Sequence, residues 1–204
     1  MEKVRMLTDT VLDRLDGPVV VLDTETTGFN AYKDRIIEFA AVKLLRGREV
    51  EHMSELINPM MPIPQSASAV NHITNEMVAG KETEAYFAPK IFNFLNNANY
   101  IVGHNVGFDI RFIEAMFRRN GLFLDGEYID TLDQARLLYP DAPNHKLGTL
   151  AEFLRLRVKD AHRALSDVHT TVELLNRIID DASSPKGFSS MSLMEESMCQ
   201  GGYF

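Results

Sequence analysis

The sequence predicts one α/β domain in which a mixed sheet is flanked by helices. Two observations support this prediction: strand-like apolar runs joined by a short turn come first, and shorter apolar runs that alternate with amphipathic helical patterns follow. The length of 204 residues, with 45% hydrophobic and 25% charged residues, suits a single folded domain with a sizeable core.

The first half of the chain predicts a short helix and then three strands. Apolar residues recur at helical spacing from Lys3 to Leu15 and a Gly-Pro pair ends the pattern, which predicts a docking helix within residues 1–17. Val19 to Leu22 is a continuous apolar run, typical of a strand buried on both faces. The runs 36–45 and 49–57 flank a turn, so the three strands are predicted to form an antiparallel meander.

The second half alternates helical patterns with short apolar runs, as α/β units do. The expected elements are a helix around 86–95, a strand at 100–102, a helix at 108–119, a strand near 128–129, and helices at 132–139, 147–154 and 164–179. We therefore assign residues 18–181 to the domain. Residues 182–204 lack periodicity and are assigned to a flexible tail or a truncated linker.

Composition narrows the classes of function. No apolar run approaches the roughly 20 residues of a membrane span, and the charged N-terminus is no secretory signal, so we expect no membrane contact and a cytoplasmic protein. Cys199 is the single cysteine, so a metal site has to use oxygen and imidazole ligands. The net charge of −8 argues against a grip on a long duplex, but it allows an acidic cleft that divalent cations neutralise.

Two segments place carboxylates at the ends of predicted elements. Asp23 and Glu25 follow the first buried strand two residues apart, so both side chains point to the same side of an extended chain. Asp109 is expected in the first turn of a helix that Asn105 would cap. Each feature alone also fits a simpler interpretation, because acids are common in surface turns and at helix N-termini.

A third segment adds another acid and a histidine. Asp167 enters the last helix five residues after His162, and this pattern alone would suit an exposed histidine beside a helix start. The set of three segments changes the interpretation. Together they supply four carboxylates, able to hold hard cations, and one imidazole, able to accept a proton near neutral pH.

These segments read VVLDTETTG, GHNVGFD and HRALSDVHTT, and their order and spacing resemble those of the DEDDh exonucleases. Within that family the chain is similar to the proofreading epsilon subunit of bacterial DNA polymerase III and to the exonuclease domain of PolC. The resemblance covers about residues 18–179. It implies an RNase H-like fold, with a mixed five-stranded sheet flanked by helices, and a 3′→5′ exonuclease that releases nucleoside monophosphates.

The resemblance also implies roles for the site residues. The catalytic set would be His162, Asp23, Glu25, Asp109 and Asp167, of which the four acids would bind two divalent cations, Mg²⁺ or Mn²⁺. His162 would take the proton from the attacking water. Residues implied to contact the substrate are Thr26, Thr27, Phe29, Asn71 and Asn105, where Asn71 stands in place of the histidine that is common in the epsilon subunit.

The expected partners are 3′ ends of single-stranded DNA or RNA and a DNA polymerase or helicase subunit. Two other functions are compatible with the sequence. An RNA exonuclease of the oligoribonuclease or ribonuclease T type would use the same metal site, because that site does not read the 2′-hydroxyl. An inactive nuclease fold that serves as a scaffold would lack one or more of the acids, and all four acids are present here.

Overall fold

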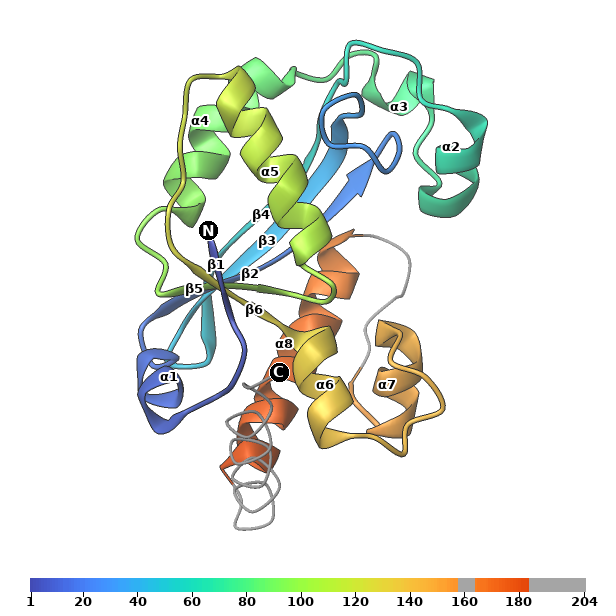
Figure 1. The fold of residues 1–204 in the computed structure, drawn as a ribbon. Coiled ribbons are helices and arrows are strands. Elements are labelled where there is room, and N and C mark those ends of the chain that lie inside the picture. Colours follow the sequence, from blue (N-terminus) through green and yellow to red (C-terminus); the bar gives the residue numbers. More distant parts are fainter. Residues whose placement is uncertain (158–163, 184–204) are drawn as a thin grey trace, which may run out of the picture.

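The computed structural model describes residues 1–157 and 164–183, and its centre is one six-stranded sheet (Figure 1). The strands are β1 (Glu2–Val4), β2 (Pro18–Thr26), β3 (Ile36–Leu45), β4 (Arg48–Leu56), β5 (Tyr100–Gly103) and β6 (Glu127–Asp130). They lie in the order β1-β6-β5-β2-β3-β4. β2, β3 and β4 pair antiparallel and the other neighbours pair parallel, so the predicted mixed sheet and meander are confirmed.

Helices cover both faces of this sheet. They are α1 (Asp9–Arg14), α2 (Gln65–Asn71), α3 (Asn75–Val78), α4 (Glu84–Leu95), α5 (Gly107–Arg119), α6 (Thr131–Leu138), α7 (Leu147–Phe153) and α8 (Ala164–Ala182). The apolar residues of α6, α7 and α8 form one core with one face of the sheet, and those of α4 and α5 form a second core with the other face (Figure 1). The result is a three-layer α/β/α arrangement.

The central strand β2 decides which layer each side chain enters. Val19 and Val21 belong to the core under α8, whereas Val20 and Leu22 belong to the core under α4 and α5. Because successive side chains of a strand alternate between faces, Asp23 follows Val21 onto the α8 side of the sheet. The apolar run therefore positions the acids that come directly after it.

The N-terminal segment differs from the prediction of one helix in residues 1–17. Residues 2–4 form β1, which adds a sixth strand at the edge of the sheet by pairing parallel with β6. The helix begins only at Asp9, because Thr8 caps it with a side chain that accepts a hydrogen bond from the Val11 amide. The helical spacing is present in the sequence, but residues 2–4 pair with the open edge of β6 and therefore form a strand.

Two smaller differences concern regions that the sequence left less defined. The proline-rich loop contains α2 and α3, which periodicity did not predict. The last helix continues to Ala182, which is buried in the core, so it passes the predicted start of the tail at 182. Residues 184–204 lie outside the described residues. Among the described helices, none combines the length and apolarity that a membrane span requires.

Candidate active site

The carboxyl end of β2 carries the first two predicted acids. Asp23 and Glu25 pair in register with residues of β3, and both side chains keep partial access to solvent. The neighbouring strand β5 ends at Gly103, where a Cβ atom would come within 2.8 Å of the Leu22 carbonyl oxygen. A glycine is needed at this close approach, and the chain then turns directly into α5. The second acidic segment thereby reaches the end of β2.

Asp109 is fixed beside the strand by Thr24. Its Oδ1 accepts hydrogen bonds from the Thr24 backbone amide (2.9 Å) and from the Thr24 hydroxyl (2.6 Å). Asp109 lies in the first turn of α5, as predicted. Burial nevertheless raises its pKa to about 7, against the effect of these hydrogen bonds. Thr24 is thus a positioning residue that the sequence motifs did not indicate.

Asn105 does not cap α5 as the sequence suggested. Val106 occupies the N-cap position, and no side chain there bonds to the helix. Asn105 instead adopts a left-handed backbone (φ 63°) and its amide donates to Asp130 Oδ1 at 2.8 Å. The Asp130 side chain also caps α6 by accepting from the Leu132 amide. The tertiary contact to Asp130 fixes this turn and takes the place of the expected cap.

Asp167 brings the third segment to the same place. It lies in the first turn of α8, which packs on β2 and β3. The pKa of Asp23 is raised well above its ordinary value, first by burial and then by the negative charges of Asp109, Glu25 and Asp167. The structure therefore brings together all four predicted acids, from three segments that are far apart in the sequence.

A fifth acid, Glu38, belongs to this cluster and was not among the predicted site residues. It lies on β3 directly opposite Glu25 and is 2% exposed. Burial and then the charge of Glu38 raise the pKa of Glu25 to about 7, with smaller contributions from Asp167 and Asp109. The sequence contained one signal for Glu38, which is the single acid in the mainly apolar run from Ile36 to Leu44. Burial of a carboxylate destabilises a fold, so an acid at such a position indicates a functional site.

The donor set of the cluster fits hard divalent cations. Its carboxylate oxygens are the ligands that Mg²⁺ and Mn²⁺ prefer, and the repulsion that raises the pKa of Asp23 is what a bound cation would relieve. Within residues 1–157 and 164–183, however, no three His, Cys, Asp or Glu side chains stand close enough together to hold a metal ion as they are placed.

A pocket of about 230 Å³ opens beside the acids. It is lined by Glu25 and by four of the five residues predicted to bind substrate, namely Thr26, Thr27, Phe29 and Asn71, together with other residues of the β2–β3 loop and α2. The Asn71 amide group donates to the Thr26 carbonyl oxygen at 3.3 Å and so joins α2 to β2. Asn105 does not line this pocket, and His162 lies outside the described residues.

We expect the metal-free protein to lose stability as pH rises. Glu25 and Asp109 have folded-state pKa values of about 7, whereas the unfolded chain ionises near the ordinary values of 4.5 and 3.8. The unfolded state therefore releases these protons first, and stability present below about pH 4 is lost progressively up to about pH 7. Thermal unfolding in the presence of a chelator should show the melting temperature falling by several degrees between pH 5 and pH 8.

Single variants provide the control for this pH dependence. Glu25→Gln and Asp109→Asn should each flatten the fall, since one buried carboxyl no longer ionises. Asp141→Asn, at an exposed position away from the cluster, should follow the wild-type curve. A wild-type melting temperature that stays constant or increases from pH 5 to pH 8 would show that these carboxyls are not perturbed as described.

An acidic cluster and a pocket at the end of the central strand of a three-layer α/β fold define a nuclease of the RNase H-like class. The chain belongs to the exonuclease family, whose sequence profile matches residues 20–175. The family and the fold inferred from the three segments are therefore confirmed, with six strands in place of five.

Its curated relatives are much longer proteins. The chain is 35% identical over 190 residues to the PolC-type DNA polymerase III of Lacticaseibacillus paracasei, and this match covers 93% of the chain and 13% of the polymerase. It is 37% identical over 163 residues to the PolC-type DNA polymerase III of Clostridium perfringens, covering 80% and 11%. The resemblance to a segment of PolC is thus confirmed, and the chain spans only about an eighth of such proteins.

Similar solved structures are also exonucleases. Exonuclease X in complex with 5′ overhanging duplex DNA has a TM-score of 0.65 and 30% identity, covering 81% of this chain and 93% of that one. A zinc-bound form of the Escherichia coli exonuclease I complex with single-stranded DNA has a TM-score of 0.70 and 25% identity, covering 80% and 42%. The E. coli exonuclease I complex with a dT13 oligonucleotide, at 0.73 and 24%, covers 85% and 43% and supports the fold alone.

Proposed function

We propose that the protein is a metal-dependent 3′→5′ exonuclease that releases nucleoside monophosphates from the end of DNA, in proofreading or repair. The observation that carries this proposal is the convergence of Asp23, Glu25, Asp109 and Asp167 beside a pocket. Burial and the charges of Asp109, Glu25 and Asp167 raise the pKa of Asp23, so these carboxylates are costly to keep together, and a function that uses them explains their proximity. Phosphodiester hydrolysis with two divalent cations is the chemistry that such a set serves best.

The acids and the histidine would have different roles in this reaction. Asp23, Glu25 and Asp167 would hold the two cations together with Asp109, which Thr24 keeps in place. When bound, two Mg²⁺ or Mn²⁺ ions neutralise charge at the phosphate and favour both the attacking and the leaving oxygen. His162 would accept the proton of the attacking water, as the motif HRALSDVHTT suggests.

The terminal nucleotide would enter the pocket beside Glu25. Thr26 and Thr27 of β2 and the loop after it line this pocket, and so does Asn71 of α2, so these three would contact the sugar and phosphate of the nucleotide. Phe29 is 93% exposed at the rim and its ring meets Phe108 edge-on, with centroids 6.3 Å apart. A base could stack on this exposed face. Asn105 would contact the substrate only from outside the pocket.

DNA is the preferred substrate in this proposal because the relatives and the solved neighbours are DNA polymerases and DNA-bound exonucleases. A polymerase or helicase subunit is the proposed partner, since the PolC relatives carry the matching segment inside a polymerase. RNA remains the alternative substrate, because the acids contact phosphate and cations and do not read the 2′-hydroxyl.

A direct assay tests the proposal. With Mg²⁺ or Mn²⁺, 5′-labelled single-stranded DNA should shorten one nucleotide at a time, and the label should stay on the long fragment because degradation starts at the 3′ end. Chelator should abolish the activity and added Mg²⁺ should restore it. Equal lengths of single-stranded DNA, mismatched primer-template and RNA should be compared in the same assay, and preference for the mismatched DNA end would support proofreading.

Other outcomes would contradict parts of this proposal. Faster degradation of RNA than of either DNA substrate would assign the protein to the RNA exonucleases. Immediate release of the 5′ label as a mononucleotide would reverse the direction. Full activity in chelator would exclude the role of the carboxylates as cation ligands.

A further inference from the structure

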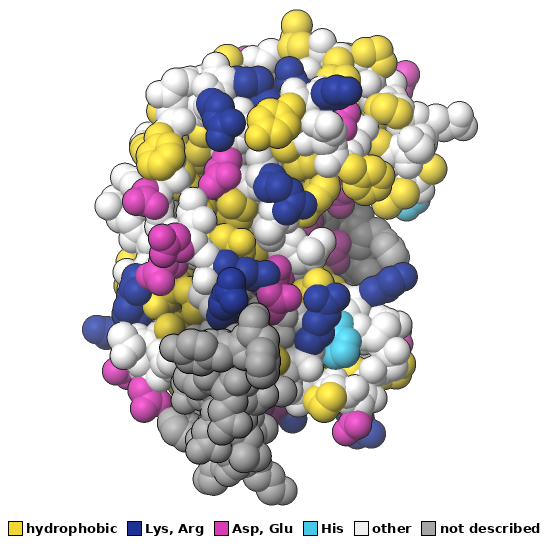
Figure 2. All heavy atoms as spheres, in the orientation of Figure 1, with side chains coloured by type: hydrophobic (Ala, Val, Ile, Leu, Met, Phe, Trp, Pro, Cys, Tyr) yellow, Lys and Arg dark blue, Asp and Glu magenta, His cyan; other side chains and the backbone are white. Residues whose placement is uncertain are grey.

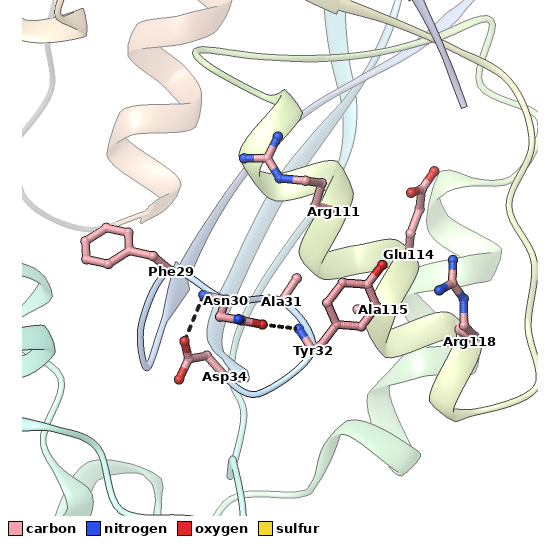
Figure 3. A pocket seen from close by; sticks show the side chains of 9 residues that line it. All are labelled: Phe29, Asn30, Ala31, Tyr32, Asp34, Arg111, Glu114, Ala115 and Arg118. Atoms are coloured by element: carbon pink, nitrogen blue, oxygen red, sulfur yellow. Dashed lines mark hydrogen bonds between the residues drawn. The ribbon is translucent and has the colours of Figure 1, made fainter.

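A second and larger pocket has a volume of about 450 Å³, and Figure 3 shows the side chains that line it. One wall is the β2–β3 loop from Phe29 to Asp34, and the other is one face of α5, from Arg111 to Arg118. Phe29 contributes to the lining of both pockets, so the two cavities are neighbours at this residue. The proposed chemistry uses none of the other residues of the larger pocket, which leaves its purpose open.

The loop presents a second aromatic side chain, Tyr32, which is 76% exposed. The loop backbone is held by its own hydrogen bonds. The Asn30 side chain accepts from the Tyr32 amide at 3.0 Å, and the Asn30 amide donates to Asp34 Oδ2 at 2.8 Å (Figure 3). Arg119 in addition donates to the Ala31 carbonyl oxygen at 3.1 Å and joins the loop to α5. Tyr32 is therefore an exposed ring on a fixed support, which is the property of a stacking platform.

The α5 wall contributes two cations. Arg111 and Arg118 are seven residues apart, two turns along the same helix face and about 10 Å in rise. In the part of the chain that the structure describes, neither guanidinium forms an ion pair, whereas the next residue, Arg119, pairs with Glu84 at 2.8 Å. In a chain of net charge −8, two unpaired cations along one pocket indicate an anionic ligand.

Among the described residues, neither acid of the pocket forms an ion pair with these two arginines. Asp34 accepts the hydrogen bond of the Asn30 amide, and Glu114 pairs with the Met1 amino group at 3.1 Å. Over the upper half of the molecule, where α4 and α5 lie, basic side chains are interspersed with hydrophobic ones (Figure 2). Alternating cations and exposed rings are what a single nucleic-acid strand needs, because phosphates and unstacked bases are presented together.

We propose that this larger pocket binds the nucleotides on the 5′ side of the one being removed, in a single DNA or RNA strand. Bases would stack on Tyr32 and Phe29, and phosphates would lie near Arg111 and Arg118, whose separation matches about three stacked nucleotides at roughly 3.4 Å each. The proposal rests on the proposed exonuclease activity only for the direction of the strand. Because Phe29 lines both pockets, this segment would lie next to the reacting end.

Binding can be measured without turnover in the full chain carrying Asp23→Asn, with Mg²⁺ present. The fluorescence anisotropy of 5′-labelled oligo-dT and oligo-rU, about six nucleotides long, gives the dissociation constant. Arg111→Gln combined with Arg118→Gln should weaken binding about tenfold or more and reduce the salt slope by about 0.7 for each phosphate that the protein no longer neutralises. Tyr32→Ala should weaken binding about tenfold, and Tyr32→Phe should restore the parental affinity because the stacking face is kept.

Matched substitutions outside the pocket control for general effects of charge and ring removal. Arg48→Gln in β4 and Phe153→Ala in α7 should bind like the parent. The proposal would be overturned if the Tyr32→Ala protein and the double arginine variant both bound within twofold of the parent. If Tyr32→Ala disturbs the loop, the double arginine variant alone tests the proposal. Equal losses of affinity for oligo-dT and oligo-rU indicate contacts to phosphates and bases that DNA and RNA share, as proposed. A wild-type protein that binds these strands but releases no nucleotide would refute only the proposed function.

Discussion

Asp23→Ala is expected to lower the rate of nucleotide release by several orders of magnitude. Asp23 lies within the cluster, where the charges of Asp109, Glu25 and Asp167 all raise its pKa, and it is a cation ligand in the proposed function. The metal-free variant should be as stable as the wild type or more stable, because the substitution removes one of several mutually repelling carboxylates. Rates on 5′-labelled single-stranded DNA with Mg²⁺ and melting temperatures in chelator measure the two effects.

The two effects have to be measured together to be informative. Asp23→Asn, which keeps the shape and removes the charge, should lose activity to a similar extent, and exposed Asp141→Asn should retain it. A loss of activity with a large loss of stability would indicate a structural role for Asp23. Activity of Asp23→Ala equal to that of the wild type would refute the entire assignment of the site.

His162→Ala is expected to lower turnover by roughly 10²- to 10⁴-fold, which is the usual contribution of a positioned general base. The four carboxylates supply the cation ligands in this proposal, so the concentration of Mg²⁺ that gives half-maximal activity should stay near the wild-type value. Part of the activity should return at high pH, where hydroxide is available without a base. Single-turnover rates from about pH 5.5 to pH 9.5 give the comparison.

The wild-type pH profile is the second measurement for this residue. The rate should rise with pH through the titration of a histidine, because only neutral imidazole accepts a proton. His169→Ala is a suitable control, because His169 is a histidine of α8 that pairs with Glu49 at 3.0 Å. If His162→Ala kept the rate and the pH profile of the wild type, another group would have to accept the proton.

Local patterns predicted most of the elements correctly. The apolar run Val19–Leu22 became part of β2, the helical pattern at 108–119 became α5, and the turn at 46–48 joined β3 to β4. In each case the signal is contained in a short stretch of sequence, since it depends on period two, period 3.6 or a turn residue. The carboxylate segments were found for the same reason, because each lies at the end of a strand or at the start of a helix that periodicity defines.

The errors arose where a distant segment decided the outcome. Residues 2–4 have helical spacing, yet they extend the open edge of β6. Asn105 looked like a helix cap, yet its amide is held by Asp130 from a neighbouring strand end. Such pairings compete with local preference through contacts that the order of residues does not reveal, so tertiary structure overrides the local signal.

By itself the sequence determined the α/β class, the antiparallel meander and the four acids with their family, because these depend on residue type, period and spacing. Only the tertiary structure decided that Glu38 faces Glu25 across β2 and β3, that Thr24 holds Asp109, and that the β2–β3 loop meets α5 in a pocket. These last features depend on strand register and on the packing of separate elements. Register and packing are set by the summed burial of many side chains, which no single segment encodes.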